Sequence, residues 1–203
     1  MAQPSPDTLL EPKVLATLDE PSDAVLIERS LRHPARFEKV FDRHFAAIHG
    51  YIARRLGSGL ADDVASETFL IAFDRRARYE PAEPDAAPWL YGIASNLIAR
   101  HRRAEVRRYR ALARAGGEQT VEGHSDGVAG RLDAQALRAR LASALLDLAA
   151  RDREVLLLVA WAQLTLEETA RALGIPAGTA RSRLHRARVK TRLALADDTK
   201  GRS

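Results

Sequence analysis

Cysteine is missing from this chain of 203 residues, and aromatic residues make up only 5% of it. The absence of cysteine excludes a disulfide framework and any metal site built on thiolates. Few β-branched runs and almost no alternation of apolar with polar residues leave little basis for strands. Alanine, leucine and arginine are abundant instead, and all three favour helices. The composition therefore predicts an all-helical protein.

Long apolar runs and enzyme motifs are also lacking. No run approaches the roughly 18 residues that a membrane span needs, and the first residues lack the basic-then-apolar order of a signal peptide. The sequence contains no His-x-x-x-His pair, no Walker motif and no Gly-x-Ser-x-Gly motif. We therefore expect a cytoplasmic protein without membrane insertion that is not an enzyme and holds no metal or cofactor.

Prolines and glycines divide the chain. Four prolines fall in residues 1–21, and five glycines fall in residues 113–131. Elsewhere apolar residues recur at helical spacing. The expected organisation is a mobile tail (1–21), a helical domain (22–112), a Gly-rich flexible linker (113–131), a second helical domain (132–196) and a short tail (197–203).

Helix signals can be placed within these domains. Ser22 is expected to cap a short helix, and Pro34 is expected to start a longer one that ends at Gly57. Three prolines make residues 79–88 a loop. The other expected helices are at 60–78, 87–110, 132–149 and 151–162.

Carboxylates are absent between Glu168 and Asp197, a stretch that holds seven lysines and arginines. At its start Thr165 and Glu168 form a capping-box pattern, and Gly174 permits a left-handed turn. The pattern predicts a helix-turn-helix whose second helix is basic. An amphipathic hairpin with a solvated basic face is the alternative, but such a face usually mixes both signs of charge. The missing acids therefore favour DNA binding.

A second basic cluster lies at 100–110, where six arginines accompany one glutamate. Trp89, Tyr91 and Asn96 precede it on the same expected helix. Rings stack on unpaired bases, amides read base edges and arginines hold the backbone, so this order suits single-stranded nucleic acid. In the alternative interpretation the aromatic residues are core anchors, and the arginines are a solubilising helix end favoured by the helix dipole.

Acidic residues gather on the expected helix at 60–78. Asp62 and Asp63 fall in its first turn, where carboxylates stabilise any helix, but this does not account for Glu67 and Asp74. The group suits either a divalent metal or a basic partner protein. Metal is less favoured, because the ligands lie on one helix with no histidine placed nearby.

Five segments together resemble the extracytoplasmic-function (ECF) group of the sigma-70 family of bacterial RNA polymerase sigma factors. The first three resemble region 2 of that family and the last two resemble region 4: residues 37–56, 61–73, 88–96, 153–158 and 178–188. Small departures concern promoter details: Ser66 stands where glutamine is common, Phe73 where tryptophan is common, and Ala149-Ala150 where a proline is usual.

The resemblance implies a dissociable initiation subunit built from two helical domains, sigma regions 2 and 4. Its implied partners are core RNA polymerase, promoter DNA and an anti-sigma factor. The acidic helix would bind the polymerase clamp, the loop at 79–88 with residues of the following helix would melt and read the −10 element, and the helix-turn-helix would read the −35 element. The implied residues are Asp62, Asp63, Glu67 and Phe69 for polymerase; Trp89, Asn96, Arg100, Arg102 and Arg103 for the −10 element; and Thr179, Arg181, Ser182, His185 and Arg186 for the −35 element.

Two other functions compete with this interpretation. A response regulator or repressor that acts without polymerase would explain residues 165–192, but it leaves the helix at 87–110 and the acidic helix without roles. A nuclease that holds a metal on Asp62, Asp63 and Glu67 is the more distant alternative.

Overall fold

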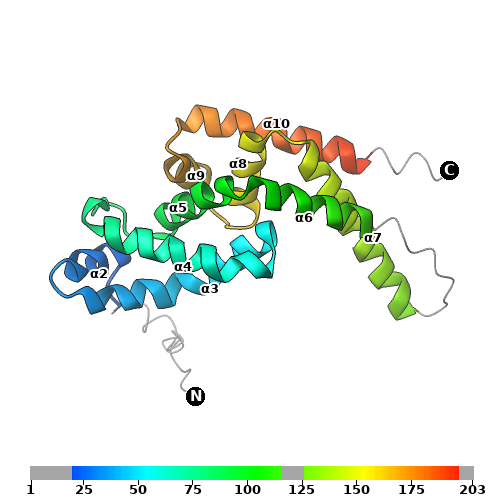
Figure 1. The fold of residues 1–203 in the computed structure, drawn as a ribbon. Coiled ribbons are helices and arrows are strands. Elements are labelled where there is room, and N and C mark those ends of the chain that lie inside the picture. Colours follow the sequence, from blue (N-terminus) through cyan, green and yellow to red (C-terminus); the bar gives the residue numbers. More distant parts are fainter. Residues whose placement is uncertain (1–19, 116–125, 197–203) are drawn as a thin grey trace, which may run out of the picture.

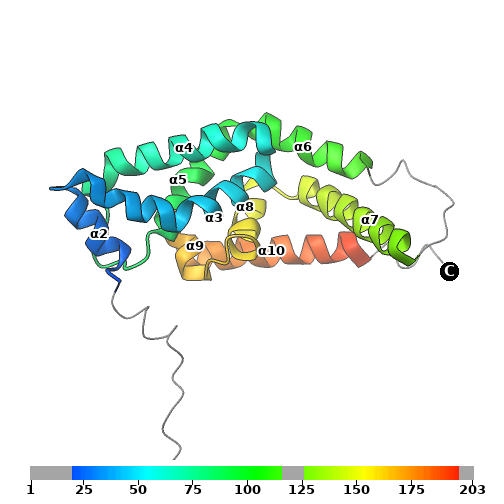
Figure 2. The same ribbon diagram turned by 90° about the horizontal axis from the view of Figure 1, so that it is seen from below.

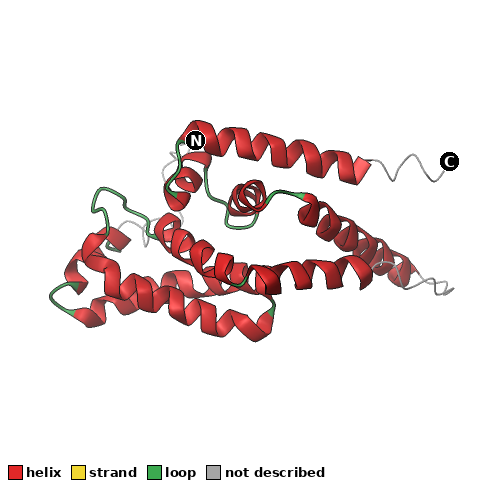
Figure 3. Cartoon of the chain, turned by 45° about the horizontal axis from the view of Figure 1, so that its top comes forward, coloured by secondary structure: helices red, strands yellow, loops and turns green. Residues whose placement is uncertain are grey.

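A computed structural model describes residues 20–115 and 126–196 of the chain. Every regular element within these residues is a helix (Figure 3), as the composition predicts. No described helix is both long and apolar enough to cross a membrane. The elements are α2 (Asp23–Ser30), η1 (Pro34–Phe37), α3 (Glu38–Leu56), α4 (Ser58–Arg75), η2 (Arg76–Arg78), α5 (Ala87–Arg100), α6 (Arg102–Ala115), α7 (Asp126–Asp147), α8 (Ala150–Ala160), α9 (Leu166–Leu173) and α10 (Ala177–Ala196). The rest of the predicted tails and linker lies outside the described residues.

The first helices begin and end at the expected signals. Ser22 caps α2, and its hydroxyl accepts a hydrogen bond from the Val25 amide at 3.4 Å. Pro34 begins η1, which continues into α3. At Gly57 the backbone adopts a φ of 95°, which favours glycine, and the chain reverses into α4. As a result α3 and α4 pack side by side (Figures 1 and 2).

The single helix predicted at 87–110 is two helices in the structure. α5 ends at Arg100 and α6 begins at Arg102, with His101 between them at φ −91° and ψ 20°. The basic run has no broad apolar stripe, so its few interior residues determine the direction of α6. These residues are Glu105 and Tyr109, and both are buried.

The predicted linker is also shorter than expected. α6 continues to Ala115 and α7 begins at Asp126, so both helices enter the range 113–131. The two helices pack side by side (Figures 1 and 2), and Gln135 donates to the Ala115 carbonyl at 2.8 Å. Packing between helices therefore overrides the low helix propensity of Gly127 and Gly130.

The two predicted domains share one hydrophobic core. The amino-terminal half (residues 20–115) contributes residues such as Ile52 and Leu97, and the carboxy-terminal half (residues 126–196) contributes Leu145 and Leu158 to the same cluster. α5 packs against α9, and α8 lies between α3 and α10 (Figure 2). The two halves therefore meet along a continuous apolar contact.

Asp23, the first residue of α2, connects three segments. Its carboxylate accepts from Arg43 at 2.9 Å and from the Ala86 amide at 3.0 Å, and it lies 2.6 Å from Nε2 of His44. Its own amide donates to the Pro84 carbonyl at 3.1 Å. Burial opposes ionisation, but the hydrogen bonds from His44, Ala86 and Arg43 outweigh it and lower the pKa of Asp23 to about 2. Asp23 thereby fixes α2, α3 and the end of the loop before α5.

Asp23→Asn should lower the free energy of unfolding by about 2 kcal/mol near neutral pH. The pKa of Asp23 falls from 3.8 to about 2 on folding, so this stabilisation is complete above about pH 4 and is lost as the pH falls toward 2. Urea unfolding at about pH 7 and at about pH 3 measures the effect. Asp42→Asn, an exposed change on α3, is the matched control. Equal losses for both variants would contradict the role of Asp23.

Candidate nucleic-acid interface

The predicted polymerase-binding carboxylates lie on α4. Asp62 and Asp63 are exposed, and Glu67 is partly exposed. Asp62 Oδ1 lies 2.9 Å from Nε2 of His49 on α3, and Glu67 accepts from Arg100 at 3.1 Å. The expectation of no nearby histidine was therefore wrong, because the neighbouring helix supplies one. The face is acidic on one side and borders the arginine cluster through Glu67.

These carboxylates do not converge on a metal position. Among the described residues, the group whose possible ligand atoms lie close together is instead Asp23, His44 and Asp85. There the carboxylate of Asp23 already accepts from Arg43 and from a backbone amide. Both oxygens of Asp23 thus already accept hydrogen bonds, Oδ1 from Arg43 and Oδ2 from the Ala86 amide, so the cluster is best described as an ion-pair network.

Phe69 does not face outward. It is 4% exposed, and its ring lies 4.9 Å from that of Phe41 and 5.9 Å from that of Phe45. The next residue, Leu70, is 61% exposed. Phe69 therefore supports the packing of α3 on α4, and Leu70 is the apolar side chain that this face of α4 presents.

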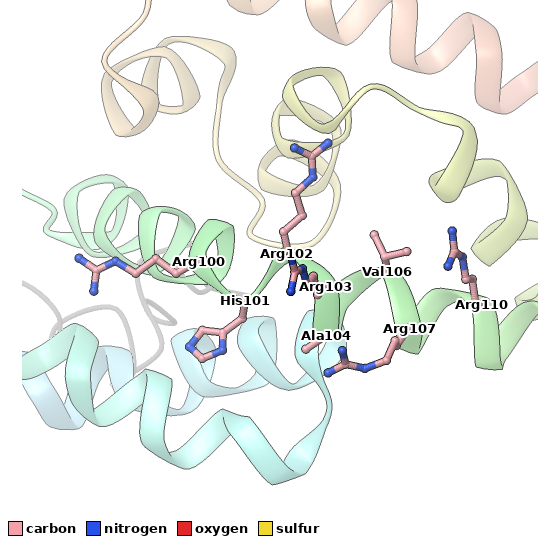
Figure 4. A pocket seen from close by; sticks show the side chains of 8 residues that line it. All are labelled: Arg100, His101, Arg102, Arg103, Ala104, Val106, Arg107 and Arg110. Carbon is pink, nitrogen blue, oxygen red and sulfur yellow. The ribbon is translucent and has the colours of Figure 1, made fainter.

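The arginine cluster forms an open hollow of about 880 Å³ at the junction of α5 and α6 (Figure 4). Arg102 extends toward α8, whereas Arg107 points the opposite way (Figure 4). The one acid of the cluster, Glu105, is buried and accepts from Arg55 at 2.7 Å. Burial of Glu105 leaves a hollow whose lining has no carboxylate, which suits a phosphate backbone. The arginines that line it are Arg100, Arg102, Arg103, Arg107 and Arg110.

Trp89 and Asn96 lie on α5, before the hollow in the chain. Both line one cavity of about 410 Å³. Trp89 is partly buried, and its ring lies 5.0 Å from that of Tyr79 at an angle of 59°. Arg171 and Ala172 of α9 form the opposite wall of this cavity. The structure thus brings Trp89 and Asn96 to one cavity, while the arginines line a separate hollow.

The helix-turn-helix has the predicted local geometry. Thr165 Oγ1 accepts from the Glu168 amide at 3.2 Å, and the Glu168 carboxylate accepts from the Thr165 amide at 2.7 Å. These two bonds complete the capping box of α9. Gly174 has a φ of 60° in the left-handed region, and the chain then enters α10.

The predicted DNA-reading residues of α10 divide into two kinds. Arg181, Ser182 and His185 are exposed and Thr179 is partly exposed, so these side chains can meet a groove. Arg186 instead donates to both oxygens of Asp152, at 2.9 and 3.1 Å. Such a two-point pair has a fixed geometry. In this structure Arg186 therefore connects α10 to the first turn of α8.

The two residues that follow Asp152 connect α8 to the amino-terminal half. Arg153 donates to Glu105 of α6 at 3.2 Å, and Glu154 accepts from Arg55 of α3 at 2.6 Å. Burial raises the pKa of Tyr51 well above its usual range, so its phenol stays protonated and donates to Glu154 at 3.3 Å. Three consecutive charged residues of α8 thus bind three different helices.

Sequence reasoning did not identify this network. Arg55 lies on an amphipathic helix and is only 2% exposed, and its partners are about 50 and 99 positions away in the chain. One signal was present: Glu105 is a single acid among six arginines. An exposed acid among these arginines would weaken the binding of nucleic acid. A buried cation that pairs with this acid keeps it away from the surface.

Comparisons with known proteins match both halves. The family model for sigma-70 region 2 matches residues 40–108, and the model for sigma-70 region 4 matches residues 138–191. RNA polymerase sigma factor CarQ of Myxococcus xanthus is 35% identical over 79% of this chain and 90% of CarQ. ECF RNA polymerase sigma factor SigL of Mycobacterium tuberculosis is 31% identical over 79% of this chain and 89% of SigL. The chain belongs to the ECF group of the sigma-70 family.

The solved structures agree with this assignment. CnrH, solved in complex with the cytosolic domain of CnrY, is 25% identical to this sigma factor and has a TM-score of 0.60 over 87% of this chain and 98% of CnrH. The amino-terminal half matches sigma-70 region 2. A repressor whose only DNA contact is a helix-turn-helix has no such domain. The interpretation as a regulator without polymerase docking is therefore not favoured.

Arg186→Ala should lower the melting temperature of this sigma factor, because it removes the two-point pair between α10 and α8. Arg188→Ala, an exposed change on the same helix, should leave the melting temperature near that of wild type. Asp152→Asn should reproduce the effect of Arg186→Ala, since it weakens the same pair. Thermal unfolding followed by circular dichroism measures all three variants. If Arg186→Ala melts like Arg188→Ala, the pair does not stabilise the fold.

Proposed function

We propose that this sigma factor binds core RNA polymerase, reads the −35 and −10 promoter elements and opens the DNA for transcription initiation. The observation that carries the proposal is the presence of two separate basic surfaces on the two halves of one chain, beside an acidic and apolar third surface. This role belongs to the cytoplasm of a bacterial cell. Residues 22–112 form the proposed region 2 domain, and residues 132–196 form the proposed region 4 domain.

The amino-terminal half is proposed to capture the melted −10 strand. Arg100, Arg102 and Arg103 hold the phosphate backbone, while Trp89 and Asn96 meet unpaired bases in the adjoining cavity. Unstacking a base costs a few kcal/mol, which stacking and hydrogen bonds in a pocket offset. Capture alone is thus sufficient to favour open DNA, without nucleotide hydrolysis.

The carboxy-terminal half is proposed to read the −35 element with α10. Arg181, Ser182 and His185 are exposed on the second helix of the helix-turn-helix, the helix that enters the major groove in this motif. Arginine pairs with guanine edges, and serine contacts more than one base. We assign Arg186 to the support of α10, through Asp152, and Thr179 to the edge of the reading face.

Polymerase is proposed to dock on α4. Asp62 and Asp63 offer charge, and Leu70 offers an exposed apolar side chain about two turns further along the helix. A charged rim around an apolar centre is the usual composition of a protein interface. Two solved structures with a similar fold are complexes: CnrH with the cytosolic domain of CnrY, and the sigma factor RpoE with the anti-sigma factor NepR. We propose that an anti-sigma factor also binds this chain.

Asp63→Arg combined with Leu70→Ser should abolish co-elution with core polymerase in gel filtration. Both side chains are exposed, so the melting temperature should stay close to that of wild type. Glu67 is left unchanged because its loss would also release Arg100. Asp147→Arg, an exposed charge reversal on α7, is the control and should co-elute normally. Co-elution of the double variant with core polymerase would contradict the proposal that polymerase docks on α4.

Asn96→Ala and Arg103→Ala should slow promoter opening by roughly tenfold, since a base or phosphate contact contributes about 1–3 kcal/mol. Binding to closed duplex promoter should change little. The defect of Arg103→Ala should vary more with salt than that of Asn96→Ala, because only arginine displaces counterions.

The measurement compares opening on a duplex promoter with binding to the same promoter carrying a pre-melted −10 bubble. Arg114→Ala, an exposed change at the end of α6, is the control. Wild-type behaviour of both variants on both templates would assign this part of α5 and α6 a structural role only.

A further inference from the structure

We propose that the two halves of the free protein dock so that α9 covers the −10-reading face of α5, while the −35-reading face of α10 stays open. The contact between the halves is observed in the structure; its meaning for DNA rests on the proposed function. In this arrangement the region 4 domain covers the surface of the region 2 domain that is proposed to bind single-stranded DNA.

Gly92 of α5 lies directly against the backbone of α9. A Cβ at this position would lie 2.4 Å from the carbonyl oxygen of Ala172 in α9 and 3.4 Å from its Cα. These are backbone atoms, which cannot rotate away as a long side chain could. Only glycine therefore permits the observed distance between α5 and α9.

Buried charges fix the same arrangement. Arg55 of the amino-terminal half pairs with Glu154 of the carboxy-terminal half at 2.6 Å, and Glu105 pairs with Arg153 at 3.2 Å in the opposite sense. Separation of the halves divides both pairs, although Arg55 keeps Glu105. A buried ion that loses its partner is strongly unfavourable, so undocking requires these groups to reach water or another partner.

Two contacts at the edge of the interface join the same halves. Arg171 of α9 pairs with Glu83, in the loop before α5, at 3.1 Å. The guanidinium of Arg54 lies 5.6 Å from the centroid of the Trp161 ring. Both contacts are more exposed than the central pairs and contribute less. The pair of Arg171 with Glu83 places α9 over the loop that the resemblance assigns to −10 reading.

The covered surface is the face along which a single strand would lie. Trp89, Gly92 and Asn96 follow one another on one side of α5, and Arg171 and Ala172 of α9 face them across the 410 Å³ cavity. A bound strand needs room for its sugar–phosphate backbone as well as for its bases. At Gly92 the backbone of α9 already occupies that room, while Asn96 stays exposed at the edge of the contact.

A second cavity continues the contact toward the arginine hollow. It has a volume of about 260 Å³ and lies between Asn96 and Arg102 on one side and Arg151 and Arg183 on the other. Arg183 of α10 therefore faces the amino-terminal half, whereas Arg181 and Ser182 are exposed to solvent. Docking thus affects the two proposed DNA-binding helices differently. Duplex DNA can reach α10, but single-stranded DNA cannot lie along α5.

Gly92→Ala is the variant that tests this difference. It should weaken docking through the Ala172 clash, and it should not unfold α5, because alanine favours a helix interior over glycine. Gly50→Ala on α3 is the matched control, since a Cβ there meets nothing within 4 Å. The absence of cysteine allows labels at Ala46→Cys on α3 and Ala177→Cys on α10, both exposed, to report the distance between the halves.

Gly92→Ala should lengthen and broaden the measured distance distribution. It should also bind a short fluorescent single strand of random sequence about tenfold more tightly, as expected when the competent state rises from a minor to a major population. Binding to a duplex of the same random sequence should not change. The Gly50→Ala control should match wild type in distance and in both affinities.

Glu154→Gln is a second variant that acts without steric conflict. It should shift the distance and the single-strand affinity in the same direction, and Glu167→Gln, an exposed change on α9, is its control. A broad distance distribution in the wild type that neither variant changes would overturn docking. Longer distances without a gain in single-strand affinity would overturn the masking of α5.

Transcription with core polymerase separates these outcomes from a failure of the proposed function. Wild-type protein that supports initiation but shows no docked distance contradicts the masking inference and leaves the sigma activity standing. Wild-type protein with docked distances that supports no initiation contradicts the proposed function and leaves the docking of the two halves in place.

Discussion

The buried Arg55 guanidinium is the group on which the arrangement of the helices depends. It lies among apolar side chains of α3 and binds Glu105 of α6 and Glu154 of α8. Removing such a charge from water is costly, and the attraction of its partners offsets that cost only when their geometry is kept. Apolar contacts tolerate small shifts between helices, whereas this ion requires its two carboxylates at fixed positions. The interface is therefore specific as well as apolar.

The first turn of α8 carries this constraint outward to the surfaces. Asp152 holds Arg186 of α10, Arg153 holds Glu105, and Glu154 holds Arg55. These contacts set the position of α10 relative to α6, and with it the distance between the two basic surfaces. Burial of Glu105 also removes the acid that would weaken the arginine hollow. One network thus supports the fold and sets the sign of charge at the surface.

Local features of the fold could be predicted from the sequence, and features made by distant contacts could not. The capping box of Thr165 and Glu168 spans one turn, and Gly174 needs only its own backbone freedom, so both follow from adjacent residues. The break at His101, the inward position of Phe69 and the pairing of Arg186 depend on helices far away in the chain. The family of each half could therefore be predicted from its sequence pattern, whereas the contact between the two halves could not.

The attachment of the loop before α5 has a consequence for the engineering of promoter preference. Asp23 binds the Pro84 carbonyl and the Ala86 amide, and the Tyr79 hydroxyl donates to the Glu83 carbonyl at 2.7 Å. The end of the loop nearest α5 is thus anchored through backbone atoms of Glu83, Pro84 and Ala86. Residues 80–82 can be exchanged for short segments of other sequences without replacing an anchoring group, which makes the proposed −10-reading loop a suitable place to graft a new base preference.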